Sequence, residues 1–282
     1  MLQRIRLALF VTVCLSTFSA LSIETIAQET EKQEEEKKAK KKGLPLRPTR
    51  KVQFETDEGT WLSLDVSADG KSILFELLGD LYELAIEGGD ATTVTEGMAY
   101  DSQPRYSPDG KWIAFISDRD GSDNVWIIRS DGTEPRKLSK EKRASFLSPT
   151  WTPDSQYVLV SKGGRETEFW MFHVNGGSGV KLEDLPAEPE TRFSGPPGSP
   201  SRRLRYGTEM SPDGRFLYFA SKRSGKTYNQ MSFDWQIYRR DMKTGDVDQV
   251  TQAQGAAVRP LLSPDGKKLV IIEGVYSMDG DV

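Results

Sequence analysis

The chain has 282 residues, of which 36% are hydrophobic and 28% charged, and its formal net charge is −4. The length suffices for one large β domain with a sizeable core, and no basic face dominates, which argues against nucleic acid as a partner. Cys14 is the only cysteine and lies in the apolar N-terminal run. We therefore expect no disulfide, thiol nucleophile or thiolate metal site in the mature chain.

Residues 1–27 have the pattern of a signal peptide. Arg4 and Arg6 give a positive start, residues 7–23 are apolar apart from small polar side chains, and small residues precede Gln28. An uncleaved membrane anchor is the alternative, because the apolar run is near the lower length limit of a spanning helix. We expect cleavage before Gln28, no membrane span afterwards, and a periplasmic or otherwise extracytoplasmic location.

Residues 28–50 form a charged linker in which acidic residues come first and lysines follow. Such a polar segment cannot bury a core, so we expect a disordered, solvated tether. An electrostatic contact with a membrane or a partner is the alternative. Pro45 and Pro48 favour an extended entry into the folded region.

Within residues 51–282 a four-residue turn recurs at intervals of 40, 45, 59 and 52 residues. A period of about 40 to 45 residues is typical of a four-stranded propeller blade. The sequence therefore predicts an all-β fold, a β-propeller of four-stranded antiparallel blades with about five repeats, the last one truncated. The turns read SADG at 67–70, SPDG at 107–110, TPDS at 152–155, SPDG at 211–214 and SPDG at 263–266.

Each residue of the turn has a defined conformational role. Proline presets φ at the first corner, aspartate bonds back to the backbone, and glycine takes the positive φ that a side chain resists. We therefore assign a structural role to Asp69, Gly70, Pro108, Asp109, Gly110, Pro153, Asp154, Pro212, Asp213, Gly214, Pro264, Asp265 and Gly266.

The second repeat shows the plan of a full blade. Residues 102–107 and 111–117 flank its turn, a loop follows, and residues 125–130 and 136–139 supply the outer strands. Two insertions interrupt the later repeats, at 183–205 and 222–234. They are either variable surface loops or contacts to a ligand, a second domain or a partner.

The fifth repeat stops after its second strand, whereas residues 50–56 resemble an outer strand without a blade of its own. A propeller pairs its last blade with its first, because unpaired edge strands invite aggregation. We expect residues 50–56 to supply one half of the ring closure, with partner strands beyond Val282 in a longer polypeptide. A small four-bladed ring with an extra hairpin is the alternative.

We assign no catalytic, cofactor-binding or metal-binding residues in this chain. His173 is the only histidine and lies in a strand-like run, and there is no Gly-Xaa-Ser-Xaa-Gly elbow. The acidic loop at 117–124 invites a calcium interpretation, but its spacing matches no full calcium-loop pattern. The tryptophans that recur at blade positions are expected to pack the blades rather than to stack on sugars.

Two stretches of the chain resemble known families. The segment SPDGKWIAFISDRDGSDNVWIIRSDGTEPRKLS at 107–139 resembles the TolB-type, WD40-like propeller repeat. Residues 54–110 resemble the N-terminal propeller of exported TolB-like amidohydrolases, in which a metal-dependent catalytic barrel follows the propeller. The repeat is specific for the fold and weak for function, because propellers serve many roles.

The second resemblance implies a scaffold or substrate gate of a periplasmic hydrolase acting on C–N bonds of cyclic amides or peptide-like substrates. It implies no cofactor in this chain, a zinc-type divalent metal in a downstream catalytic domain, and that domain or envelope proteins as partners. Two alternatives stay open: a non-catalytic TolB-like binding propeller, and the propeller of a prolyl oligopeptidase-type serine peptidase. A His-Xaa-His, a serine elbow or an early stop beyond Val282 would distinguish them.

Overall fold

The computed structural model describes residues 50, 54–60, 62–163, 167–182, 205–222, 235–252 and 256–274. The expected signal peptide, the linker apart from Arg50, and most of both insertions lie outside the described residues. The outer strand expected at 50–56 is undescribed at 51–53, and residues 54–56 form no strand. No helix among the described residues is long and apolar enough to cross a membrane.

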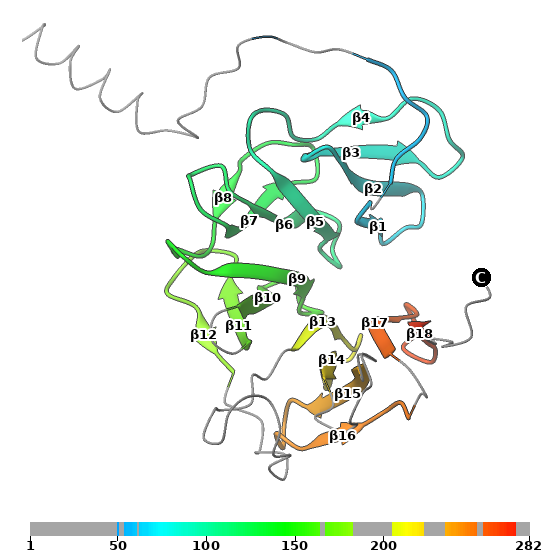
Figure 1. Cartoon of the computed structure of the whole chain (residues 1–282), viewed down its shortest axis with the longest axis vertical. Coiled ribbons are helices and arrows are strands. Elements are labelled where there is room, and N and C mark those ends of the chain that lie inside the picture. The colour runs from blue at the N-terminus through cyan, green and yellow to red at the C-terminus, as the bar shows by residue number, and fades with distance from the viewer. Residues whose placement is uncertain are drawn as a thin grey trace, which may run out of the picture. The chain divides into compact units, whose positions relative to one another are not determined.

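The described residues form five antiparallel sheets, four with four strands and one with two (Figure 1). This confirms the all-β fold and the four-stranded antiparallel blades. The first two sheets contain β1 (Leu64–Val66), β2 (Ser72–Leu77), β3 (Asp80–Ala85) and β4 (Thr92–Thr93), then β5 (Asp101–Tyr106), β6 (Trp112–Ser117), β7 (Asn124–Arg129) and β8 (Arg136–Lys137).

The later sheets repeat this plan. They contain β9 (Ser145–Trp151), β10 (Tyr157–Gly163), β11 (Glu168–His173) and β12 (Val180–Lys181), then β13 (Arg205–Met210), β14 (Phe216–Lys222), β15 (Trp235–Asp241) and β16 (Val247–Gln249), and last β17 (Ala256–Leu262) and β18 (Leu269–Gly274). In every sheet the spatial order of the strands follows the chain.

The first strand of each sheet lies against the first strand of the next. Contacts run from β1 to β5, from β5 to β9, from β9 to β13 and from β13 to β17, a succession that Figure 1 shows. We call these five the inner strands. A shared row of inner strands is the radial arrangement of propeller blades, and it brings residues about 40 or more positions apart in sequence into contact.

The hydrophobic core lies between successive sheets. Alternate residues of β6 point to opposite faces: Ile113 and Phe115 pack with Leu74 of the first sheet, whereas Ala114 and Ile116 pack with Val158 and its neighbours in the third. Both faces of the strand are therefore buried. This explains why the strand is an almost unbroken apolar run rather than an alternating one.

The fifth sheet is packed on one face within the described residues. Leu269 and Ile271 pack toward the fourth sheet, beside Ala257 and Ile237. The alternate side chains Val270 and Ile272 are 61% and 55% exposed.

The five repeated turns share one hydrogen-bond pattern, which the second turn illustrates. Ser107 Oγ donates to Asp109 Oδ1 (2.7 Å) and accepts the Trp112 N–H (2.9 Å). The N–H of Gly110, at φ 69°, donates to the Ser107 carbonyl (2.8 Å). In the third turn Ser155 takes the same left-handed conformation at φ 59°. Each turn thus closes a hairpin and satisfies its own polar groups.

The turn aspartates are stabilised in their ionised form. In the fourth turn the Ser211 hydroxyl and the Arg215 N–H donate to Asp213, and the serine bond is the main reason that the pKa of this carboxyl lies below 3.8. A carboxyl whose pKa falls on folding contributes stability at higher pH. That contribution is lost as the pH falls below the unfolded value.

We predict that Asp213→Asn weakens the acid dependence of folding, because the variant has no carboxylate to protonate. Urea unfolding from about pH 6 to about pH 2 should show a smaller loss of stability below about pH 4 than in the wild type. Asp90→Asn, at an exposed position outside the turns, is the control. Parallel curves for the wild type and Asp213→Asn would contradict the assignment.

Candidate functional site

A β-bulge occurs at the same place in four of the described inner strands. The register shifts between Ser102 and Arg105 in β5, and at the corresponding positions of β9, β13 and β17. Inside each bulge one residue has a positive φ: Gln103 at 53°, Ser148 at 54°, Gly207 at 70° and Arg259 at 51°. Each of them lies four positions before the first residue of its turn. A bulge releases a backbone N–H from the ladder, and that donor needs another acceptor.

Side chains of the preceding blade supply the acceptors for three of these four groups. Ser63 Oγ accepts the Gln103 N–H (3.1 Å), Gln103 Oε1 accepts the Ser148 N–H (2.7 Å), and Ser148 Oγ accepts the Gly207 N–H (2.9 Å). The residue that donates at one boundary is therefore the residue that accepts at the next. We call this row of bonds the inner relay. It fixes the register of each blade on its neighbour through polar contacts of defined geometry.

We predict that Ser148→Ala lowers the free energy of unfolding by about 1–2 kcal/mol, because the Gly207 N–H loses its acceptor. Ser145→Ala is the matched control, since Ser145 lies in the same strand and is exposed. Chemical denaturation of both variants provides the comparison. Equal stabilities for the two variants would show that the relay bond contributes nothing.

Charged residues occupy the inner strands two positions further along. Asp65 Oδ2 accepts the Tyr106 N–H of the next blade (2.8 Å). Arg105 donates through one guanidinium nitrogen to the Leu64 carbonyl (3.2 Å) and to Asp65 Oδ1 (3.4 Å). The carbonyl of Arg105 in turn accepts the indole N–H of Trp151 (3.0 Å). The first three blades are thus joined at this second level as well.

Glu209 has the equivalent position in the fourth blade and accepts the backbone N–H of Leu262. Burial raises the pKa of Glu209 to about 7; Arg105 opposes this rise, and Asp65 adds to it. Burial also raises the pKa of Asp65, against the lowering effect of Arg105. We call Asp65, Arg105 and Glu209 the central charge cluster. It holds one arginine for two carboxylates.

The sequence did not predict the central charge cluster, because the repeated turns are its strongest signal. Its signal was nevertheless present: each member lies two positions before the first residue of a turn, in otherwise strand-like sequence. Thr150 and Leu261 occupy this offset in the third and fifth repeats. The turn residues themselves hold strand ends and supply no group to the cluster.

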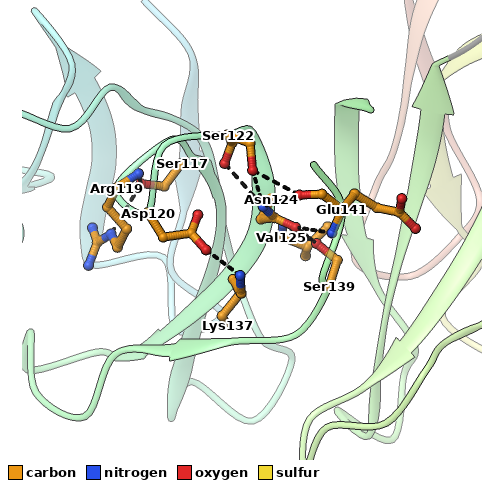
Figure 2. Close-up of polar contacts among 9 residues, drawn as sticks. All are labelled: Ser117, Arg119, Asp120, Ser122, Asn124, Val125, Lys137, Ser139 and Glu141. Carbon is orange, nitrogen blue, oxygen red and sulfur yellow. Dashed lines mark hydrogen bonds and ion pairs between the residues drawn. The ribbon is translucent and has the colours of Figure 1, made fainter. Parts of the chain in front are cut away.

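Two of the three aspartates in the acidic loop at 117–124 are engaged in protein contacts. Asp118 accepts the Tyr100 N–H (2.8 Å), and Asp120 forms an ion pair with Lys137, which Figure 2 shows. Arg119 reaches back to Asp101 (2.6 Å). In the part of the chain that the structure describes, no group of three or more histidine, cysteine or acidic side chains could hold a metal ion.

Asn124 organises the same loop from its buried side. Its amide nitrogen donates to Ser122 and to the Glu141 carbonyl (3.1 Å), while its amide oxygen accepts from Ser139 Oγ (2.7 Å) and the Glu141 N–H (2.9 Å) (Figure 2). These groups belong to the loop before β7, to the start of β7 and to the segment between β8 and β9. The loop is therefore a structural tie between neighbouring strands.

His173, which ends β11, takes part in a turn. Its Nδ1 accepts the Asn175 N–H (3.0 Å), and its ring packs edge-on against Tyr157 with centroids 4.9 Å apart. The Nδ1 lone pair is therefore engaged within the turn. These contacts give His173 a structural role at the turn that follows β11.

Comparison with known proteins points to propellers. The Tricorn protease N-terminal beta propeller domain family matches residues 63–197. A protein of Bacillus subtilis named uncharacterized peptidase YuxL is 27% identical over 192 residues, which are 68% of this chain and 24% of that protein. Dipeptidyl-peptidase 5 of Porphyromonas gingivalis is 35% identical over 113 residues, 35% of this chain and 15% of that protein.

A solved structure described as a TolB from Agrobacterium tumefaciens has a TM-score of 0.59 and 25% identity, covering 77% of this chain and 70% of that one. The chain has β-propeller blades, and it is similar to the Tricorn N-terminal and TolB-like propellers, as the repeat resemblance implies. It spans only a small part of the two peptidases. Their names support the peptidase alternative over the amidohydrolase expectation.

We predict that Glu209→Gln removes a pH dependence of stability. A carboxyl whose pKa rises from 4.5 to about 7 on folding stabilises the protein fully below about pH 4.5, and this contribution is lost as the pH rises through about 7. The variant should equal the wild type near pH 5 and exceed it by about 1–3 kcal/mol at about pH 8.

Denaturant unfolding across this pH range tests the prediction, with Glu87→Gln as the control at an exposed position. A difference between Glu209→Gln and the wild type that stays constant with pH would contradict the account of Glu209.

Proposed function

We propose that this chain supplies the propeller of an exported peptidase-type protein and that its inner strands face the peptide on which that protein acts. The observation that carries the proposal is the similarity to YuxL, 27% over 192 residues, which lies across the blades. Dipeptidyl-peptidase 5 adds a second peptidase with a shared stretch of sequence. The N-terminal signal pattern supports an extracytoplasmic location.

The inner surface has the chemistry that this role needs. An extended peptide presents alternating carbonyl and N–H groups, and it is recognised by backbone donors and a few charged groups. Three of the four bulge N–H groups are already bonded within the inner relay, so the inner strands offer mainly the charged groups of the central charge cluster. The reacting residues are proposed to lie outside the blades, since His173, the only histidine of this chain, ends a blade strand and the chain has no Gly-Xaa-Ser-Xaa-Gly elbow.

A TolB-like binding propeller is the second candidate, favoured by the structural similarity that covers 77% of this chain. In that case the same inner strands or the loop ends would bind an envelope protein without hydrolysis. The amidohydrolase interpretation, with a zinc-type metal in a downstream domain, stays a prediction from the sequence resemblance.

The test is to purify the native cellular product with an antibody against residues 51–282, measure its intact mass, and assay it. We predict a mass above 31.6 kDa, labelling by a fluorophosphonate probe, and cleavage of fluorogenic dipeptides that a metal chelator does not affect. Chelator-sensitive hydrolysis of cyclic amides would favour the amidohydrolase instead. A product that hydrolyses neither class would leave the binding propeller as the function.

A further inference from the structure

The hairpin between β2 and β3 places a leucine where leucine is conformationally disfavoured. Leu77 pairs with Asp80, so the turn between them has two central residues. These are Leu78 and Gly79, and both have a positive φ, 55° and 90°. Two-residue turns of this kind favour asparagine, aspartate or glycine, because a bulky side chain resists a positive φ. The leucine therefore strains the backbone of the turn.

The side chain of Leu78 gains little from the fold. It is 74% exposed, the highest value among the exposed large hydrophobic side chains of the described residues. The leucine is thus unfavourable twice, in backbone conformation and in hydration, while most of its surface is open to water. A residue that departs from local preference without a gain in the folded state indicates a role in binding.

Two further exposed apolar side chains come from the segment that leads from β4 to β5. Met98 is 47% exposed and Tyr100 is 58% exposed. This segment lies along the hairpin, because the Asp101 N–H donates to the Gly79 carbonyl (2.8 Å). A Cβ built on Gly79 would lie 3.0 Å from Tyr100 Cδ2, so the ring packs directly over the turn. We call Leu78, Met98 and Tyr100 the apolar tip.

The ring of Tyr100 is held in its exposed position by polar bonds. Its hydroxyl donates to Glu76 Oε1 (2.8 Å), and its backbone N–H donates to Asp118 Oδ1 (2.8 Å). Glu76 in turn accepts from Ser63 Oγ (2.6 Å). An aromatic ring that is already ordered loses little conformational entropy when a partner covers it. The apolar tip is therefore preorganised for contact.

The apolar tip lies in an acidic stretch of the chain. Residues 72–104 contain seven acidic residues and no lysine or arginine. Four of the seven lie in or beside the hairpin and the segment that leads to β5: Glu76, Asp80, Glu96 and Asp101. Arg119 of the next blade pairs with Asp101 (2.6 Å). Burial raises the pKa of Asp80, and the charges of Asp101 and Glu96 raise it further, so negative charge stays in excess there.

We propose that the apolar tip and its acidic surroundings form a docking surface for a basic segment of a partner protein. That segment brings an apolar side chain to Leu78 and lysine or arginine side chains to Asp80 and Glu96. The proposal goes beyond the proposed function and does not rest on it, because this surface lies at the hairpin rather than on the inner strands.

The sign of the charge selects this occupant. An anionic membrane surface and a nucleic acid are both repelled by a cluster of carboxylates. A symmetric contact between two copies of this chain sets identical acidic groups against each other. A basic polypeptide gains from the carboxylates and covers the apolar tip with its own apolar side chains.

The first test uses the full 282-residue chain labelled with nitrogen-15 and three acetylated, amidated heptapeptides. The basic apolar peptide is Lys-Ala-Leu-Lys-Leu-Ala-Lys, and the other two replace its lysines by glutamates or its leucines by serines. In about 20 mM salt we expect the basic apolar peptide to shift the amide resonances of Leu78, Gly79 and Tyr100 with a Kd on the order of 1 mM. The other two should bind at least about tenfold more weakly. Equal binding of the three peptides, or no shift at these residues, would overturn the proposal.

The variant Leu78→Asn separates binding from folding. Asparagine tolerates a positive φ better than leucine, so the denaturant midpoint should stay the same or rise. The Kd of the basic apolar peptide should increase at least about fivefold, because its apolar contact is lost. Ile86→Asn is the matched control, since Ile86 is 46% exposed and directly follows the other end of β3, and it should leave the Kd unchanged. A lower midpoint or an unchanged Kd in Leu78→Asn would contradict the proposal.

The variant Asp80→Asn tests the charge, and sedimentation tests the identity of the partner. Asp80→Asn should increase the Kd of the basic apolar peptide about two- to fivefold and weaken its dependence on salt. The same Kd and salt dependence as in the wild type would remove the electrostatic part of the proposal. The chain alone should sediment as a monomer. A dimer that Leu78→Asn dissociates would show that a second copy is the occupant and would overturn the assignment to a different protein.

Discussion

The requirement that backbone donors at the inner strands find acceptors organises this propeller. Each described bulge frees an N–H that the ladder does not use, and in three cases a side chain of the neighbouring blade accepts it. A second level of bonds, from Asp65 to Tyr106 and from Glu209 to Leu262, repeats the same solution with carboxylates. Blades are thus positioned by directional bonds at their inner edge. The apolar layers between sheets stabilise the contact between blades, but because hydrophobic packing is non-directional they do not fix the register of one blade on the next in the same way.

The apolar layers between sheets and the hydrogen bonds at the inner strands have different roles, and this difference indicates which residues can vary with function. Apolar residues such as Phe115 and Phe219 are fully enclosed between sheets, so changing them alters the packing of the fold. The residues of the central charge cluster and the side chains of the inner relay are only partly enclosed, and they bond to a neighbouring blade. The residue type differs there from blade to blade, as with Ser148 in the third blade and Gly207 at the equivalent position of the fourth, while the apolar layers stay alike. Binding specificity can therefore vary on a constant scaffold.

The sequence predicted the fold well because turn chemistry is local. Proline, aspartate and glycine at fixed offsets define the hairpin wherever they occur, and apolar runs such as 112–117 indicate strands with two buried faces. The central charge cluster escaped prediction because its members are far apart in sequence. Asp65 and Glu209 interact electrostatically only once the blades are assembled. The raised pKa of Glu209 depends on burial that no local pattern shows. Their constant offset from the turns is visible only after the geometry is known.

Native-state hydrogen exchange of the inner-strand amides tests the central claim most directly. If neighbouring side chains hold the bulge N–H groups, the amides of Gln103, Ser148 and Gly207 should be protected to a similar degree, and that of Arg259 should exchange at least about tenfold faster. Slow exchange at Arg259 equal to that of the other three would contradict the account. Fast exchange at all four would contradict it as well, because the relay would then hold none of them.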